Sequence, residues 1–514
     1  MDKRKKPLVI AGISVGSHAL KIKIVDVTEK EEIITLEKVS KKTSLGRDTF
    51  SKGIVSYEVV DEVCQVLKGF KRLMTTYNVQ TYQALATTGI REAENRDYIL
   101  DQIKSKTGLN VELINSSLKR FLTYKAVREK LPNHQQRRSE GSMFLDIGSG
   151  SIELSIYSNG NLTFSQDLKL GSLRLKELLV SLEDKTLNFP KVLDDYIRSN
   201  TDILWKTFDF HEPINHFVLI GDIIKDICSI CNSNDYSIDK TRFLTMYQEL
   251  LNKPHHKTMY NHNISQEGAY ILLPTMMLAK IFLDMTSSSK IYTPLVSLED
   301  GIVANIMDEK LNTHRKQEFL QDTYSLVKTI AEKYRYDEKH AHEVEKKSLI
   351  LFDALKKLHG LGDQERLLLS LAAVLHDIGK FINMNNHYNH SYNIIIASNI
   401  MGISQEQLEI IGNVAKYHSS LTPKMAHKNF SQLSFLDRVV VAKLVSIIRI
   451  ADALDRSHQQ KIKDIKIRIQ DKKVIIKAIA KGDTLLEEWT FENKSIFFEE
   501  VFGIKPILSI EREA

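Results

Sequence analysis

The feature that most constrains the fold is the stretch from Phe144 to Leu154, which reads FLDIGSGSIEL. Apolar residues lead into Asp146, small residues follow, and the chain then alternates between apolar and polar residues. This order predicts a strand, a tight turn and a second strand. Glycines in such a turn let backbone N–H groups approach phosphate oxygens, and Asp146 at the strand end could hold a divalent metal. A β-hairpin with a turn of small residues explains the stretch equally well.

A similar pattern opens the chain. Residues 8–27 form an apolar run, a turn at Gly16-Ser17 and an alternating run, about 130 residues before the turn at 148–151. Two such units predict two related α/β halves, whose turns close on a ligand from opposite sides of a cleft. Chance similarity between two short hairpins is the alternative.

Hydrophobic periodicity divides the chain into further parts. Helices and strands alternate to about residue 310, which favours α/β layers, and long amphipathic helices follow from residue 313. From Lys461 an alternating pattern returns and predicts a small α+β cap. The expected domains are 1–128, 140–310, 313–458 and 461–514, with a polar linker at 131–141. The expected helices include 57–77, 318–333, 338–359, 364–378, 391–400, 404–417, 437–455 and 494–501, and the expected strands include 82–86 and 506–510.

Composition narrows the class of protein. A length of 514 residues allows roughly three domains, and a net charge of +6 fits an anionic ligand but is too small to indicate nucleic-acid binding. Apolar runs fall short of the roughly 20 residues that cross a bilayer, and the start lacks a signal-peptide pattern. Cys64, Cys228 and Cys231 form no disulfide framework, and the lone CxxC lacks a second pair of zinc ligands. We therefore expect a cytoplasmic protein that binds neither membranes nor specific nucleic acid.

A second group of chemically active side chains lies in the helical part. His376 and Asp377 are adjacent, His342 lies one helix upstream, and Asp452 lies on a helix downstream. Two imidazoles and two carboxylates suit a divalent cation such as Mn²⁺, Mg²⁺ or Fe²⁺.

The order His…His-Asp…Asp on successive helices resembles the HD-domain phosphohydrolase superfamily. The resemblance implies that these four residues hold a metal, and an HD fold that has lost its metal is the alternative. His390 and His418 could bind a second metal or a phosphate.

Short motifs follow one another in a fixed order along the chain. They are Gly16-Ser17, Leu45-Gly46, Thr87-Thr88 with Arg91 and Asn95, Asp146–Glu153, Leu170-Gly171-Ser172, the HD block with Arg449, Asp452 and Asp455, and Glu499–Gly503. This order resembles the Ppx/GppA phosphatase family, in the subgroup with a C-terminal HD domain. The resemblance implies an α/β actin-like (ribonuclease H-like) two-domain core, followed by an all-α HD domain and a small α+β C-terminal cap.

The resemblance also implies an activity and a role for each matching residue. The activity is hydrolysis of polyphosphate from its end, or of the terminal phosphate of guanosine pentaphosphate, with Mg²⁺ or another divalent metal and commonly in a homodimer. Asp146 would position Mg²⁺, Glu153 would support the metal or the attacking water, and Arg91 would clamp a phosphate oxygen. An ordinary surface charge is the alternative for Arg91. The residues that would cradle phosphate are Gly16, Ser17, Gly148, Ser149, Gly150 and Ser151.

Several positions depart from the family pattern. Ser14 stands where the first turn of the family carries an acid, so one metal partner is missing. Residues 113–120 stand where the family has Ile-Ser-Gly followed by glutamates, one of which is the usual general base. Lys119 in this segment would need a large fall in pKa to accept a proton at neutral pH. Segments 221–223 and 297–302 also depart from the family motifs of the same cleft.

Three functions follow from these observations. The first is a phosphoanhydride hydrolase of the exopolyphosphatase or guanosine pentaphosphate phosphatase type that acts in the actin-like cleft, although the usual catalytic glutamate is missing. The second places metal-assisted hydrolysis at the HD site. The third is a sensor that binds polyphosphate or a guanosine tetra- or pentaphosphate in the cleft and reports to a partner by domain closure.

Overall fold

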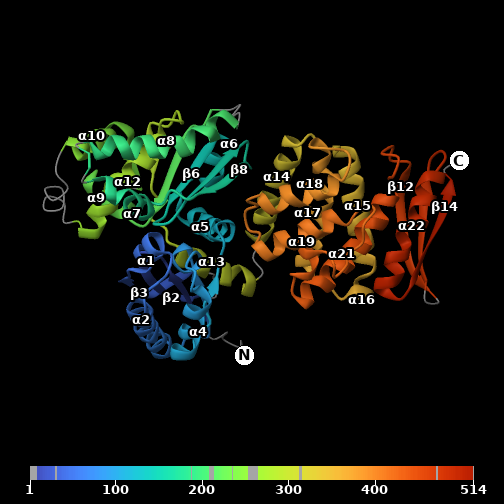
Figure 1. Cartoon of the computed structure of the whole chain (residues 1–514), viewed down its shortest axis with the longest axis horizontal. Coiled ribbons are helices and arrows are strands. Elements are labelled where there is room, and N and C mark those ends of the chain that lie inside the picture. The colour runs from blue at the N-terminus through green and yellow to red at the C-terminus, as the bar shows by residue number, and fades with distance from the viewer. Residues whose placement is uncertain are drawn as a thin grey trace, which may run out of the picture. The chain divides into compact units, whose positions relative to one another are not determined.

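The computed structural model describes residues 8–28, 32–183, 185–186, 188–207, 213–233, 236–252, 264, 266–311, 315–470 and 473–512. Its chain divides into two compact units, Met1–Thr323 and Tyr324–Ala514 (Figure 1).

The N-terminal unit begins with a five-stranded sheet in the order β3-β2-β1-β4-β5. β2 runs antiparallel to β1 and β3, whereas β4 runs parallel to β1 because helix α2 carries the chain back between them. Apolar residues recur along α2 at helical spacing, so one face of this helix joins the core beside the sheet. The elements are β1 Leu8–Val15, β2 Ala19–Val27, β3 Ile33–Lys42, α1 Leu45–Lys52, α2 Tyr57–Thr76, β4 Thr81–Ala86, α3 Thr88–Arg91, α4 Arg96–Thr107, β5 Glu112–Leu113 and α5 Ser116–Lys130.

A second sheet follows in the order β10-β11-β9-β6-β7-β8. Its β8-β7-β6-β9-β11 part has the same strand order and directions as the first sheet, so the predicted repeat of two halves is present in the topology. α13 packs against α5 and β1, which brings the last helix of this half back to the first half. The elements are α6 His134–Ser139, β6 Ser142–Ile147, β7 Ile152–Ser158, β8 Asn161–Leu168, α7 Ser172–Glu183, α8 Phe189–Thr207, β9 His216–Gly221, α9 Ile224–Ile230, β10 Ser237–Asp239, α10 Lys240–Asn252, α12 Gln266–Leu283, β11 Lys290–Tyr292 and α13 Leu298–Leu311.

The C-terminal unit is a set of packed helices, coloured from gold to orange in Figure 1, followed by a three-stranded sheet in the order β12-β13-β14, coloured red. α22 packs against α21 and β14, so the sheet shares one apolar core with the helices. Helix α14 Arg315–Lys333 contains the boundary between the two units. The later elements are α15 Glu338–Ala354, α16 Lys356–His359, α17 Asp363–Leu375, the 3-10 helix η1 Ile378–Phe381, α18 His387–Ala397, α19 Gln405–Lys416, α20 Lys428–Ser431, α21 Phe435–Ala453, β12 Ile462–Gln470, β13 Lys473–Ala480, α22 Leu485–Phe502 and β14 Lys505–Arg512.

Two expectations about local structure need correction. The segment 131–141 is no simple linker, because it contains α6, whose His134 and Arg138 are buried. His134 packs on the rings of Tyr124 and Phe144, which explains why this polar sequence is held in the fold. The expected C-terminal helix 494–501 is a fragment of the longer α22, because its buried residues begin earlier, at Glu487. Among the described residues, no helix combines the length and the apolar character that would let it cross a membrane.

Candidate phosphate cleft and metal centre

The two predicted turns lie on one cavity of about 480 Å³ in the N-terminal unit. Gly16 and Ser17 line it from the turn between β1 and β2, and residues 148–151 line it from the turn between β6 and β7. Close packing makes glycine necessary here, because a Cβ on Gly150 would lie 2.8 Å from Thr88 Cγ2. All six residues that we expect to bind phosphate are therefore placed around one space.

Asp146 and Glu153 face each other across the β6–β7 ladder, and a lysine lies between them. Lys119 Nζ, from α5, is 2.7 Å from Glu153 Oε2 and 3.2 Å from Asp146 Oδ2. Burial lowers the pKa of Lys119, but the two carboxylates outweigh burial and hold that pKa above its usual value. Burial raises the pKa of Glu153 to about 7, with Lys119 opposing the rise and Asp146 adding to it. Lys119 is therefore a charged partner of both acids.

The Mg²⁺ that the resemblance places at Asp146 does not fit this donor set. A divalent cation bridging Asp146 and Glu153 would lie against the Lys119 ammonium, which already contacts one oxygen of each acid, and the two positive groups would repel each other. From the sequence alone, Lys119 is expected only to be a poor general base. Its role as a cation depends on the packing of α5 beside β6 and β7, which no local motif reveals.

The other acids of the cavity also have partners. Ser14 Oγ donates a hydrogen bond to Glu299, which α13 brings to the end of β1. Asp222 forms an ion pair with Lys21, with 2.7 Å between Oδ1 and Nζ. The positive charge of Lys21 lowers the pKa of Asp222. Three positions that depart from the family pattern thus have partners within the cleft: Ser14 and Glu299 contact each other, and Asp222 contacts Lys21.

Arg91, which we expect to clamp phosphate, contacts protein groups instead. Its Nη1 donates to the carbonyl of Ile114 at 2.6 Å, and its Nη2 donates to Thr88 Oγ1 at 3.2 Å and to Ser116 Oγ at 3.4 Å. These bonds tie the end of α3 to the start of α5. Arg91 thereby helps to fix the helix that carries Lys119.

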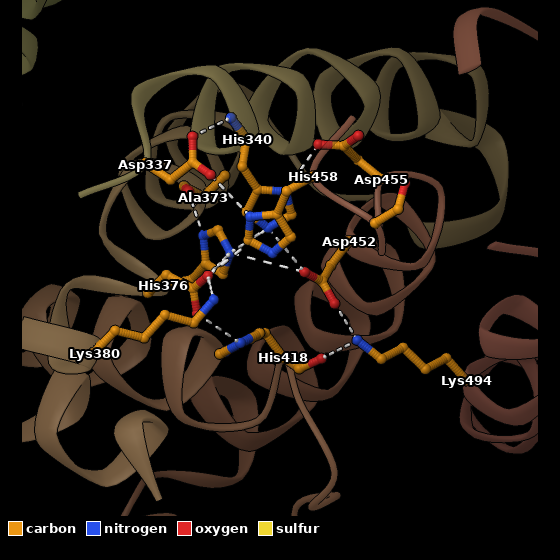
Figure 2. A network of polar contacts seen from close by, with 12 residues as sticks. Asp337, His340, Ala373, His376, Lys380, His418, Asp452, Asp455, His458 and Lys494 are labelled. Carbon is orange, nitrogen blue, oxygen red and sulfur yellow. Dashed lines mark hydrogen bonds and ion pairs between the residues drawn. The ribbon is translucent and has the colours of Figure 1, made fainter. Parts of the chain in front are cut away.

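Side chains from three helical segments converge in the C-terminal unit (Figure 2). His340 comes from the first turn of α15, His376 and Asp377 follow the end of α17, and Asp452 lies on α21. His340 Nε2 is 3.3 Å from His376 Nε2, 3.3 Å from Asp452 Oδ1 and 3.8 Å from Asp377 Oδ2. All four side chains are buried. We call these four residues the metal-ligand cluster.

The outer ring nitrogens fix the orientation of both imidazoles. His376 Nδ1 donates to the carbonyl of Ala373 at 2.7 Å, which leaves the Nε2 lone pair facing the cluster. His340 Nδ1 donates to Asp455 Oδ2 at 2.9 Å and has the same orientation. Burial lowers the pKa of His376 to about 3, so this ring is neutral. Burial also lowers the pKa of His340, but hydrogen bonds to Asp452 and Asp455 outweigh it and raise the pKa to about 9.

Asp377 contacts a second pair of histidines through its other oxygen. Asp377 Oδ1 is 3.2 Å from His387 Nε2 and 3.4 Å from His418 Nε2. The Nδ1 atoms of these rings donate to the carbonyls of Met384 and Ala415 at 3.1 and 2.6 Å. Both Nε2 atoms thus face the same carboxylate oxygen of Asp377. A cation between them would have three donor atoms around it.

Two lysines flank the cluster. Lys494 Nζ, from α22, contacts Asp452 Oδ2, and Lys380 Nζ is 2.5 Å from Asp377 Oδ2. Burial raises the pKa of Asp452, but Lys494 and His340 outweigh it and keep that pKa well below its usual range. The oxygen Asp452 Oδ1 remains directed at the histidines, so the cluster keeps a charged donor.

The donor set of the cluster fits a divalent cation. Ligand atoms of His340, His376 and Asp452 lie within 4.8 Å of one another, and those of His376, Asp377 and His418 do so as well. Neutral imidazole nitrogens and carboxylates are suitable ligands for Mn²⁺, Fe²⁺ or Zn²⁺.

One predicted metal ligand is wrong. His342 is exposed, and its place is taken by His340, two residues earlier on α15. Two residues turn a helix by about 200°, so these side chains face opposite ways. The burial of Ala341, Val344 and Ser348 marks the inward face, and His340 lies four residues before Val344. That helical spacing was a signal that could have selected His340 from the sequence.

The family models match most of the chain. The Ppx/GppA phosphatase family matches residues 23–310, and domain III of Ppx/GppA phosphatases matches residues 324–495. The chain belongs to the Ppx/GppA phosphatase family.

Curated proteins are similar to the chain at low identity. A bifunctional 3-dehydroquinate synthase/phosphatase from Fusobacterium nucleatum is 23 % identical over 43 % of the chain, and the match spans only 33 % of that protein. A guanosine-5′-triphosphate,3′-diphosphate pyrophosphatase from Aliivibrio fischeri is 20 % identical over 83 % of the chain and 84 % of its own length. Exopolyphosphatase 1 from Mycobacterium tuberculosis is 25 % identical over 32 % of the chain and 46 % of its own length.

Solved structures agree with the fold. An exopolyphosphatase from Cytophaga hutchinsonii has a TM-score of 0.52 at 18 % identity, and covers 59 % of this chain and 98 % of its own. The Aquifex aeolicus member of the Ppx/GppA family has a TM-score of 0.50 at 18 % identity, with 59 % and 99 % covered. The first family match contains the 148–151 turn of the cleft but begins after the turn at Gly16 and Ser17, and the second contains the metal-ligand cluster.

Proposed function

We propose that this chain is a phosphoanhydride hydrolase that releases terminal phosphate from polyphosphate or guanosine pentaphosphate, with a divalent metal held by the metal-ligand cluster. The observation that carries the proposal is the meeting of His340, His376, Asp377 and Asp452 donor atoms, with the outer imidazole nitrogens anchored. The names of the relatives support the substrate class. In this proposal the C-terminal helices form an HD domain, and the chain works as a homodimer.

The residues around the cluster have separate tasks. A bound Mn²⁺ or Mg²⁺ would supply hydroxide near neutral pH and polarise a phosphoryl oxygen. Asp455 and the Ala373 carbonyl orient the histidine rings, while Lys494 neutralises the outer oxygen of Asp452. Lys380, whose side chain is 29 % exposed, offers an ammonium group to an approaching phosphate chain.

A second candidate places hydrolysis in the N-terminal cleft. The observation in its favour is the cavity lined by both Gly/Ser turns. Asp146, Glu153 and Arg91 would then carry the catalysis, as the family resemblance implies. Two sets of contacts weigh against this candidate. Lys119 contacts the carboxylates of Asp146 and Glu153, and the guanidinium of Arg91 is hydrogen-bonded to the carbonyl of Ile114, so these groups are not free for the reaction.

Phosphate release from polyphosphate and guanosine pentaphosphate, measured with Mg²⁺ or Mn²⁺, separates the candidates. We expect His340→Ala and the double variant His376→Ala with Asp377→Ala to abolish release, and Asp146→Ala to retain it. His342→Ala is the matched control, because it makes the same change at an exposed position on the same helix. Loss of release only in Asp146→Ala would place the chemistry in the cleft. Tight binding without turnover by the wild-type chain would indicate a sensor and overturn both candidates.

A further inference from the structure

The N-terminal cleft carries its own cation. The Lys119 side chain is 15 % exposed, and its Nζ contacts both carboxylates that the family resemblance assigns to a metal and its water. These carboxylates, Asp146 and Glu153, are 11 % and 0 % exposed, so solvent screens the three charges weakly. The ammonium stands where a bridging metal would be expected.

We propose that Lys119 replaces the divalent metal of this cleft, so that the N-terminal unit binds a phosphoanhydride chain without metal. The inference rests on the substrate class proposed above, and is independent of the site where hydrolysis takes place.

Charge balance supports the replacement. A glutamate that carries a divalent cation contributes a net charge of +1, and a protonated lysine contributes the same. With Lys119 where the family resemblance expects glutamates, the ammonium supplies to Asp146 and Glu153 the positive charge that a metal would otherwise supply. An incoming phosphate therefore meets a cation without any ion from solution.

The position of the ammonium also suits a phosphate ligand. A Lys119 ammonium has three N–H donors, of which one is hydrogen-bonded to Glu153 Oε2, while Asp146 Oδ2 lies 3.2 Å from Nζ as an ion-pair partner. Lys119 lines the cavity, and a Cβ built on Gly148 would lie 3.2 Å from its Nζ, so the ammonium lies directly beside the predicted phosphate turn. The third donor is left for an oxygen held by that turn.

The rest of the cavity favours an anion over a second cation. Glu299 accepts the Ser14 hydroxyl, and Asp222 is paired with Lys21. Lys38 and Lys225 add two further positive groups to the lining. Asp146 and Asp222 already have lysine partners that a free metal would need to displace, whereas Glu299 Oε2 is buried and has no hydrogen-bond partner among the described residues.

The test is calorimetric titration of tripolyphosphate into the full chain carrying His376→Ala and Asp377→Ala, which removes donors of the C-terminal cluster. Titrations are run in chelator and again with Mg²⁺. We expect similar affinity in both conditions. Lys119→Met should weaken binding at least about tenfold, because it removes a charge-assisted hydrogen bond. Lys119→Glu should bind tripolyphosphate only when Mg²⁺ is present.

The control is Lys125→Met, the same change at a buried, ion-paired lysine on the same helix, where Nζ contacts Asp308 at 2.7 Å. Lys125→Met should leave tripolyphosphate binding unchanged. Any weakening that it does cause measures the effect on binding of losing a buried charge from α5. Binding by the His376→Ala, Asp377→Ala chain that disappears in chelator would overturn the proposal, as would unchanged binding when Lys119→Met is added or no binding in either condition. Rescue of Lys119→Glu by Mg²⁺ excludes misfolding as the cause of a loss. Phosphate release is not used as a readout, so failure of the proposed hydrolysis would be seen separately.

Discussion

His340 Nε2 and His376 Nε2 face each other at 3.3 Å while the opposite nitrogen of each ring donates a hydrogen bond outward. Since the pKa of His340 is raised to about 9, its Nε2 carries the proton that lies between the two nitrogens, and a divalent cation would take the place of that proton. A divalent cation should therefore stabilise the folded chain, by about 2.7 kcal/mol at a concentration 100 times its Kd. Thermal unfolding with and without Mn²⁺ measures this effect. His340→Ala should lose the shift and His342→Ala should keep it; equal shifts in both variants would place the bound metal elsewhere.

Asp452 and Lys494 form a buried ion pair between α21 and α22, with side chains 6 % and 9 % exposed. Asp452→Ala leaves the ammonium buried and unpaired, and should destabilise the C-terminal unit by about 3–5 kcal/mol. Urea unfolding measures the change. The double variant with Lys494→Met should recover part of the loss, because no uncompensated charge remains. A double variant as unstable as the sum of the single variants would contradict this account.

Buried His134 should make stability depend on pH. Burial, with help from Arg138 and Arg128, lowers its pKa to about 3 from an unfolded value near 6.5. The folded chain keeps the ring neutral, so this contribution is complete above about pH 6.5 and is lost as pH falls toward 3. The slope reaches about 1.4 kcal/mol per pH unit. Denaturant unfolding from pH 7 to 4 should show a shallower fall for His134→Gln than for wild type. Parallel curves would show that His134 is protonated in the fold.

Gly171 and Gly69 should respond oppositely to alanine. A Cβ on Gly171 would lie 2.3 Å from the carbonyl carbon of Gly150, and backbone atoms there cannot move aside cheaply. Gly171→Ala should destabilise the N-terminal unit by about 1–3 kcal/mol and weaken phosphate binding. Around Gly69, on α2, no described heavy atom lies within 4 Å of a built Cβ. Gly69→Ala should stabilise by up to about 1 kcal/mol. Chemical denaturation of the two variants checks both signs.

The elements predicted from sequence are those whose signals are local. Periodicity alone predicts the helix at 57–77, because one face of α2 is buried along its length. The two Gly/Ser turns could be paired because each follows an apolar strand, and both strands occupy the same position in their sheets. The small C-terminal α+β part is also predicted from a local signal, the alternation of apolar and polar residues. Its helix, however, begins at Leu485, earlier than expected.

The errors concern residues whose roles depend on distant partners. The choice between His340 and His342 depends on which face of α15 meets α17 and α21, and His387 contacts Asp377 where sequence reasoning named His390. The role of Lys119 depends on carboxylates 27 and 34 residues away. Arg91 lies in a motif that suits phosphate binding, but its guanidinium donates a hydrogen bond to the carbonyl of Ile114 instead.

The lysine between Asp146 and Glu153 has a genetic consequence. The codons for lysine and glutamate differ only in their first base. One base change therefore separates a cleft whose cation is the Lys119 ammonium from a cleft that must bind a metal ion from solution. Lys119→Glu would gather three carboxylates beside the Gly148 turn, and the fold would then tolerate the site only with a cation bound. A single mutation can thus tie the stability of the N-terminal unit to the supply of a divalent ion in the cell, or release it from that supply.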